Sequence, residues 1–183
     1  TISVSHAYHL TLVTGIAVTN SIRNLGLDAR IKWPNDILIN NKKICGILTE
    51  INAEMEKVDY IIIGIGINAN IDTGMFSSEL KKGSTSIKSE LGKPLKRVPF
   101  VQNLLYELEQ EYMKFKSKPF TDIIDEWIAL SDTIGKQVSI MTHSKMIEGK
   151  AIGITKDGAL IVKKPDGKTE EVIAGRCIYT RTK

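Results

Sequence analysis

The stretch Ala29–Leu48 reads ARIKWPNDILINNKKICGIL, and its pattern decides how the first half of the chain folds. Residues 29–34 predict a strand that Pro34 ends, because proline cannot donate a hydrogen bond to a strand ladder. Two apolar runs then flank the turn-prone residues 40–42, which predicts a hairpin. Lys32, Asp36 and Lys43 therefore lie on one strand–turn–strand unit. Two ammonium groups beside a carboxylate suit the binding of a polyphosphate, its metal ion and a carboxylate undergoing activation.

Helical periodicity appears on both sides of this unit. Residues 10–25 place apolar side chains on one stripe, and Gly26 is expected to end that helix. Residues 98–116 and the segment after Pro119 predict two more helices whose apolar stripes face the core. The expected core residues of these two helices are Val101, Leu104, Leu105, Leu108, Tyr112, Phe115, Phe120, Ile123, Ile124, Trp127, Ile128 and Leu130.

Two segments between the hairpin and the helix at residues 98–116 differ from each other in composition. Residues 58–67 are nearly all apolar and β-branched, which predicts a strand buried on both faces. Residues 70–97 are rich in Gly, Ser, Lys and Thr, and they predict a long surface loop with a short helix at most.

The last quarter of the chain lacks a helical period. Residues 136–183 predict five short strands, at about 136–143, 146–155, 159–164, 168–174 and 176–181, with Asp-Gly turns between some of them. Short antiparallel strands of this kind predict a small barrel. We therefore expect an α+β protein with two domains, residues 1–133 and residues 134–183.

Composition limits the classes of protein that the chain can belong to. Its 183 residues are 42% apolar and 25% charged, as in a soluble globular protein. No apolar run approaches the roughly 20 residues needed to cross a bilayer, and the start does not resemble a signal peptide. Cys45 and Cys177 are predicted to be small buried side chains rather than zinc ligands. The three histidines have no metal-binding spacing, and the cytoplasm is the expected compartment.

The net charge of +4 is unevenly distributed. Residues 134–183 hold 10 Lys/Arg and 5 Asp/Glu, so this part alone carries +5. An acidic binding partner and a merely lysine-rich soluble surface both explain this excess.

Three motifs in order resemble those of biotin protein ligases. They are Lys32-Trp33-Pro34-Asn35-Asp36, then Lys43-x-x-Gly46-Ile47-Leu48-x-Glu50, then Gly64-Ile65-Gly66-Ile67-Asn68. Ser84-Thr85-Ser86-Ile87 also resembles the segment that precedes the family's pair of helices. The resemblance implies a class II synthetase-like catalytic domain with a mixed sheet, followed by an SH3-like barrel.

The resemblance also implies a two-step reaction. Biotin and ATP give biotinyl-5′-AMP and pyrophosphate, and a lysine of a biotin carboxyl carrier protein then displaces AMP. ATP and Mg²⁺ are the implied cofactors and biotin is a substrate. A homodimer is possible within this family, and no membrane partner is expected.

The resemblance assigns catalytic and biotin-binding residues. Lys43 is the first candidate to contact both the biotin carboxylate and the phosphoryl oxygen. Asp36 is a candidate catalytic residue that binds Mg²⁺ or orients Lys43. The alternative is a structural role in which Asp36 caps the turn. Gly46 would leave room for biotin, with Ile47 in apolar contact, unless Gly46 only marks a β-bulge.

The resemblance also points to ATP-binding residues. Lys32 is a candidate phosphate ligand, and Asn35 is either an ATP ligand or a turn residue. Gly64 and Gly66 would clear one strand face for a flat group such as adenine. Asn68 can donate and accept hydrogen bonds, which suits an adenine edge.

Several alternatives stay open. A lipoate or octanoate ligase has a related architecture, and a biotin-sensing corepressor would use the same site. DNA is a partner only if a winged helix lies upstream. Residues 134–183 could also form an independent interaction module. The chain starts without methionine, and the family's glycine- and arginine-rich loop is missing from it, so we expect residues 1–183 alone to bind biotin weakly.

Overall fold

The computed structural model describes residues 7–54, 57–75 and 77–180, and four antiparallel strands form its first sheet. They lie side by side in chain order: β1 (Arg30–Lys32), β2 (Asp36–Ile39), β3 (Lys42–Glu54) and β4 (Lys57–Ile67). The β2–β3 hairpin turns at Asn40 and Asn41, whose φ angles of 50° and 62° suit a two-residue hairpin turn. The predicted strand, turn and hairpin are therefore confirmed.

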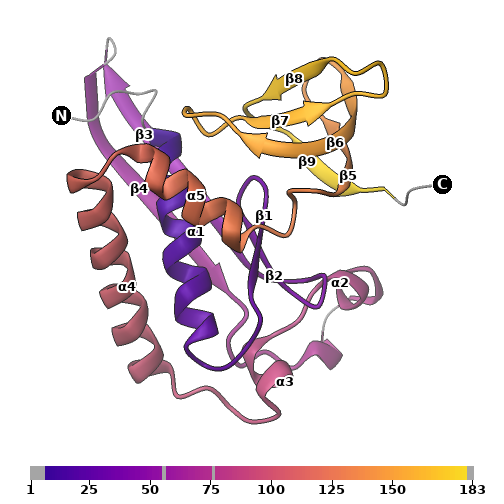
Figure 1. Cartoon of the computed structure of the whole chain (residues 1–183). Helices are drawn as coiled ribbons and strands as arrows, with labels where there is room; N and C mark the ends of the chain where they lie inside the picture. The colour runs from indigo at the N-terminus through magenta and orange to yellow at the C-terminus, as the bar shows by residue number, and fades with distance from the viewer. Residues whose placement is uncertain (1–6, 55–56, 76, 181–183) are drawn as a thin grey trace.

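Helix α1 (Ala7–Arg23) lies between this sheet and two outer helices, α4 (Arg97–Ser117) and α5 (Phe120–Leu130) (Figure 1). Ile16, Ala17 and Val18 are each 0% exposed although they are consecutive and point in three directions. A helix that is apolar on every side must be covered on every side, and the sheet, α4 and α5 provide that cover. Gly26, with φ of 84°, follows the helix end as predicted.

Two predictions about burial were wrong, the second only in part. The strand at residues 58–67 is not buried on both faces, since Tyr60 and Ile62 are 54% and 52% exposed. It is an edge of the described sheet, and only alternate residues pack against the core. Along α4 the prediction was half right. Leu104, Leu108 and Phe115 pack in or against the core as expected. Val101, Leu105 and Tyr112 are exposed, and Phe100 and Glu111 are buried in addition to Leu104. The apolar residues of α5 lie largely in the core, as expected.

The segment at residues 70–97 contains more structure than predicted. It holds a 3₁₀ turn, η2 (Thr73–Met75), and two short helices, α2 (Ser78–Gly83) and α3 (Ile87–Leu91). Ser86 caps α3 by accepting a hydrogen bond from the Ser89 N–H. No helix in the described part of the chain is long and apolar enough to span a membrane.

The five predicted C-terminal strands are all present. They are β5 (Gln137–Met141), β6 (Met146–Ile154), β7 (Leu160–Lys163), β8 (Thr169–Val172) and β9 (Arg176–Tyr179). Their order is β8-β7-β6-β5-β9, all antiparallel, and no ladder between β8 and β9 closes a barrel among the described residues. The α+β fold is confirmed, with the predicted barrel present as a curled open sheet (Figure 1).

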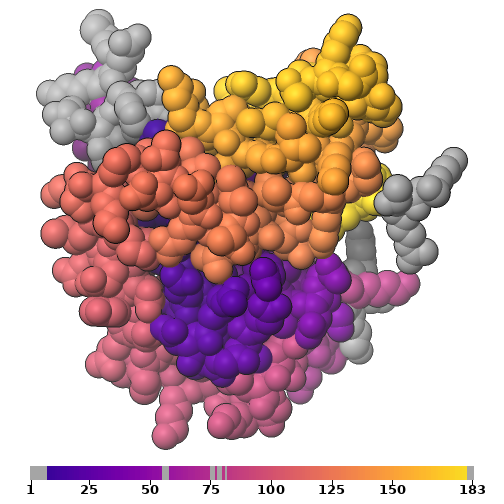
Figure 2. All heavy atoms as spheres, viewed as in Figure 1, coloured from indigo at the N-terminus to yellow at the C-terminus, as the bar shows by residue number. Residues whose placement is uncertain are grey.

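The C-terminal sheet lies against α5 and the β1 end of the first sheet. Figure 2 shows its strands, in orange and yellow, resting directly on α5. The connection is anchored by Thr133, which is 0% exposed and accepts a hydrogen bond of 2.9 Å from the Trp33 N–H. Ile31 and Ser131 add a parallel bridge beside it. The segment joining the two sheets is therefore fixed on the Lys-Trp-Pro-Asn-Asp motif, while the division into two domains stays a prediction.

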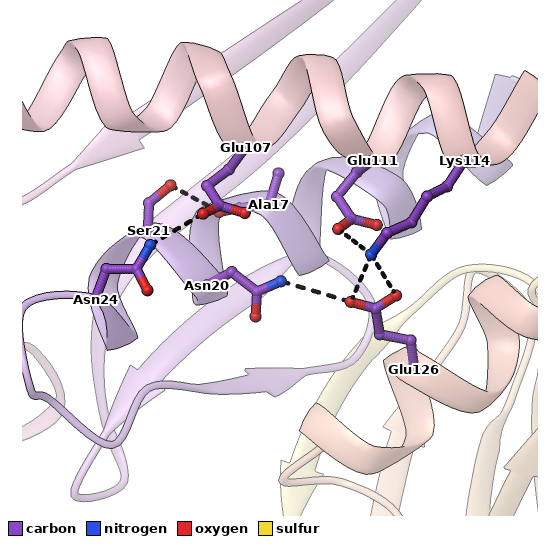
Figure 3. A network of polar contacts seen from close by, with 8 residues as sticks. All are labelled: Ala17, Asn20, Ser21, Asn24, Glu107, Glu111, Lys114 and Glu126. Carbon is purple, nitrogen blue, oxygen red and sulfur yellow. Dashed lines mark hydrogen bonds and ion pairs between the residues drawn. The ribbon is translucent and has the colours of Figure 1, made fainter.

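A partly buried ionic network links the three helices (Figure 3). Glu111 of α4 is 1% exposed, and Lys114 binds its Oε1 at 2.6 Å and Glu126 of α5 at 3.1 Å. Asn20 of α1 also reaches Glu126, at 3.5 Å. The Glu111 Oε2 atom is buried without a hydrogen-bond partner in the described part of the chain. Burial raises the pKa of Glu111, although Lys114 partly opposes this.

The Glu111 carboxyl should make the stability of the protein depend on pH. Its pKa is raised above the ordinary 4.5 in the folded state. Its contribution is thus fully present below pH 4.5 and is lost as the pH rises through the folded-state value. Relative to Glu111→Gln, which does not titrate, the wild-type protein should lose free energy of unfolding over this window. Urea denaturation from pH 4 to 7 measures the difference, and parallel curves would contradict the assignment.

Candidate functional site

The turn after β1 is held rigidly by its own backbone contacts. The Trp33–Pro34 peptide bond is cis, and the Trp33 side chain is 1% exposed. Asn35 clamps the turn onto β3: its side-chain amide donates to the Ile47 carbonyl at 2.6 Å, and its own carbonyl accepts from the Ile47 N–H at 2.9 Å. The side-chain amide of Asn35 therefore holds the turn in place. This agrees with the alternative that Asn35 is a turn residue.

Lys43 and Asp36 form an ion pair above Gly46. Residues three apart in a strand normally point to opposite faces. Here Ile37 pairs with Cys45 and Leu38 pairs with Lys43, so Ile44 is an extra, bulged residue on β3. The bulge brings Lys43 onto the face of Gly46, where a Cβ atom would lie 3.0 Å from the Lys43 Nζ. A side chain at position 46 would therefore have to displace the Lys43 ammonium group from its place over the strand.

Lys32 lies on the same side of the sheet. It is the cross-strand partner of Asp36, and its Nζ is 5.2 Å from the centre of the Tyr179 ring. Lys32, Asp36 and Lys43 line one cavity of about 320 Å³, together with Ser84 and Tyr179. The structure therefore brings together the three charged residues that the sequence singled out.

An open glycine floor continues from these charges. Gly46 pairs with Gly66, and Leu48 pairs with Gly64, across β3 and β4. An added Cβ at Gly64 or Gly66 would meet only ordinary contacts, at 3.6 and 3.7 Å. By contrast, a Cβ at Gly149 would collide with the Lys163 carbonyl. Packing within the chain explains Gly149 but not the two floor glycines, so the floor is free to receive a flat ligand.

Two apolar neighbours in β3, Ile47 and Leu48, lie on opposite faces of the sheet. Ile47, predicted to contact biotin, is 2% exposed and packs in the core on the opposite face from Gly46. Leu48, which sequence reasoning passed over, is 61% exposed and stands beside Gly64. Strict alternation from Gly46 would have identified Leu48 as the side chain on the open face.

Asn68 directly follows β4, and its hydrogen bonds connect this strand end to the Ser84-Thr85-Ser86-Ile87 segment. Its side-chain amide donates to the Thr85 carbonyl at 2.9 Å, and its carbonyl accepts from the Ile87 N–H at 2.8 Å. The Thr85 N–H in turn donates to the Lys43 carbonyl at 2.9 Å. Asn68 thereby supports the backbone of Lys43, and its amide oxygen is the group through which it could bind a nucleotide.

Both cysteines are free and buried, as predicted. Burial raises the pKa of the Cys45 thiol to about 12 and that of Cys177 to about 11, so both stay protonated. Among the described residues, no three His, Cys, Asp or Glu side chains gather as a metal site. A larger cavity of about 460 Å³ lies between the end of α1 and the start of α4. It contains none of the site residues above.

Two family models match the chain. Residues 1–68 match the biotin/lipoate A/B protein ligase family, and residues 133–179 match the biotin protein ligase C-terminal domain. The chain belongs to the biotin protein ligase family. The resemblance inferred from the three motifs is therefore confirmed.

Individual members of the biotin protein ligase family support the assignment. The bifunctional ligase/repressor BirA of Bacillus subtilis is 39% identical over 159 residues, 86% of this chain and 49% of that protein. The biotin–[acetyl-CoA-carboxylase] ligase of Paracoccus denitrificans is 28% identical over 141 residues, 75% of this chain and 58% of that protein. The chain thus spans about half the length of these curated ligases.

The chain also shares its fold with a solved member of the family. The biotin protein ligase of Aquifex aeolicus, solved in complex with biotin and ATP, superposes with a TM-score of 0.81 at 26% identity. The match covers 96% of this chain and 72% of the Aquifex chain.

Proposed function

We propose that the protein activates biotin with ATP and transfers it to a lysine of a biotin carboxyl carrier protein. The observation that carries this proposal is the Lys43–Asp36 pair held above Gly46 at the edge of an open glycine floor. A cation at the end of an apolar sheet face suits a ligand with an apolar body and a carboxylate. The named relatives include a ligase of acetyl-CoA carboxylase and a ligase solved with biotin and ATP.

In the first step a biotin carboxylate oxygen attacks the α-phosphorus of ATP, and the bond to the β-phosphate bridging oxygen breaks. The products are biotinyl-5′-AMP and pyrophosphate. Two anions approach each other in this step, so preorganised cations lower its barrier. Lys43 is placed to hold the carboxylate and the α-phosphoryl oxygen together, and Asp36 keeps its ammonium in position.

In the second step a carrier lysine amine attacks the anhydride carbonyl, and AMP leaves with the bonding electron pair. The amine loses its proton and an amide forms. Asp36, 23% exposed beside Lys43, is the carboxylate that we assign to accept that proton. An acidic carrier surface would complement the charge of +5 on residues 134–183.

Mg²⁺ fits this site when it is bound jointly by Asp36 and the phosphates of the nucleotide. Asp36 offers a single carboxylate, and one of its oxygens already faces Lys43. Such a donor set suits Mg²⁺, which is often held by one carboxylate and substrate phosphates. The ion would neutralise phosphate charge, while Lys43 and Lys32 act directly on the phosphoryl oxygens.

The proposed function is tested by assaying two candidate acids against each other. The protein at its natural length should catalyse biotin-dependent exchange of pyrophosphate into ATP and should label a carrier domain with biotin. Lipoate or octanoate in tenfold excess should not suppress that labelling. Lipoyl transfer without biotin transfer would favour the related lipoate ligases and reject the proposal.

Gly66→Val should separate ligand binding from folding. Valine suits a strand, and its Cβ would meet only ordinary contact with the Gly46 carbonyl. Its branches would occupy the floor, so biotin or adenylate affinity should fall by a factor of ten or more, on the order of a misfitted apolar pocket. Calorimetry measures the affinity, and urea denaturation should show stability within about 1 kcal/mol of wild type.

The matched control for this prediction is Gly153→Ala on β6. An added Cβ there would also meet only an ordinary contact, 3.9 Å from Ile161, but on the other sheet. This variant should bind biotin as the wild-type protein does. Unchanged biotin affinity in folded Gly66→Val would show that the glycine floor does not receive the ligand.

A further inference from the structure

The cavity that holds the catalytic charges is closed by a residue from the other end of the chain. Lys32, Asp36 and Lys43 line it from the first sheet, and Tyr179 lines it from β9 of the C-terminal sheet. The aromatic ring of Tyr179 therefore lies beside the proposed nucleotide phosphates, although it is 136 residues beyond Lys43 in sequence.

Tyr179 is fixed in place by the Lys-Trp-Pro-Asn-Asp motif itself. Its hydroxyl is 3.1 Å from the Thr133 Oγ1, and that oxygen also accepts the Trp33 N–H at 2.9 Å. Thr133 is fully buried, so the bridge is protected from water. Burial also raises the pKa of the Tyr179 hydroxyl, which therefore stays neutral. The Tyr179 ring and the Lys-Trp-Pro-Asn-Asp motif are thus joined through the Thr133 side chain.

Lys32 depends on this ring for its position. Its cross-strand neighbour Asp36 is engaged by Lys43, and the ion pairs of the described residues do not tie Asp36 to Lys32. The lysine stem is flexible and loses substantial rotamer entropy when it is held. A carboxylate partner would hold Lys32 but would cancel its charge. An aromatic face attracts the ammonium and leaves its charge available for an anion.

We propose that Tyr179 is a positioning residue that holds the Lys32 ammonium toward the polyphosphate of ATP. The C-terminal sheet thereby completes the phosphate end of the adenylation site. This inference rests on the proposed function, and it adds a residue that none of the three sequence motifs contains.

The structure provides an internal control on the same ring. The Lys136 Nζ lies 4.3 Å from the ring centre of Tyr179, closer than Lys32. Lys136 is engaged by Asp132 at 2.7 Å, however, and it does not line the cavity. Removal of Lys136 should therefore leave ATP binding unchanged, whereas removal of Lys32 should weaken it.

The test is a double-mutant cycle in the protein at its natural length. Biotin-dependent pyrophosphate exchange gives KM for ATP and kcat for Tyr179→Leu, Lys32→Met, Lys136→Met and the double variant Lys32→Met/Tyr179→Leu. Tyr179→Leu should raise KM for ATP on the order of tenfold, as for a partly desolvated cation–π contact, with a smaller change in kcat. Tyr179→Phe keeps the ring and should restore most of the affinity. In the Lys32→Met background, Tyr179→Leu should add little.

Additive effects of Lys32→Met and Tyr179→Leu would overturn the inference, as would an unchanged KM for ATP in folded Tyr179→Leu. Cooperative urea unfolding identifies folded variants, and Tyr179→Met takes the place of Tyr179→Leu if the latter fails to fold. Absence of biotin-dependent exchange in the unmodified protein would reject the proposed function itself. Exchange that Tyr179 variants do not alter would reject only the role of Tyr179.

Discussion

Lys43→Ala should slow formation of biotinyl-5′-AMP by a factor on the order of 10² to 10³, the usual loss when one preorganised donor is removed from a developing oxyanion. Lys43 is the cation that the bulge places over Gly46, and Asp36 fixes its direction. Alanine would leave the carboxylate and the α-phosphate to approach without that charge. Biotin-dependent pyrophosphate exchange measures this half-reaction separately from transfer to the carrier.

Lys42 provides the matched control for Lys43. It is the adjacent residue in β3 and is exposed, but it does not line the cavity. Lys42→Ala should retain exchange within about twofold of wild type, as is usual for exposed surface substitutions. Exchange at the wild-type rate in Lys43→Ala would remove Lys43 from the mechanism, whatever the behaviour of Lys42→Ala.

Lys114→Met should lower the free energy of unfolding by about 3 kcal/mol, near the lower end of the range for breaking a buried ion pair. The lower end applies because the Lys114 side chain is 37% exposed, whereas Glu111 is almost fully buried. The substitution leaves the Glu111 carboxylate buried without its cation and also releases Glu126. Urea denaturation at pH 7 measures the loss.

Two further variants show whether the loss comes from the uncompensated charge. In Glu111→Leu/Lys114→Met both charges are replaced by apolar groups, and stability should return to within about 1 kcal/mol of wild type. Lys116→Met removes a lysine of the same helix whose Nζ lies 5.7 Å from the Tyr112 ring centre, and it should change stability by less than about 0.5 kcal/mol. A double variant as unstable as Lys114→Met would attribute the loss to packing instead.

Periodicity in the sequence predicted which elements form, but not which faces they bury. The alternation and turn residues around Asn40 and Asn41 specify a hairpin locally, so its prediction succeeded. The face that β4 buries depends on what packs against the sheet, and this left Tyr60 and Ile62 exposed. Along α4, the buried stripe includes Glu111, which hydrophobicity alone assigns to the surface.

The candidate site was predicted in part, for a similar reason. Lys32, Asp36 and Lys43 are close in sequence, and the strand–turn–strand unit that joins them is local. Tyr179 reaches the cavity only through tertiary packing of the C-terminal sheet, which no local pattern encodes. The faces of Ile47 and Leu48 could have been assigned from strict alternation that starts at Gly46.

The bulged residue Ile44 allows Lys43 and Gly46, three residues apart in sequence, to share one face of β3. Deleting Ile44 would regularise the ladder and would leave Lys43 two residues before Gly46, on the same face of the strand. Exchanging Ile44 for another apolar residue keeps the count and the ammonium in place. The bulge therefore lets the consecutive residues Ile44 and Cys45, 0% and 1% exposed, both enter the core while Lys43 stays on the open face with Gly46. A polar residue at position 44 would thus cost stability without redirecting the ammonium group.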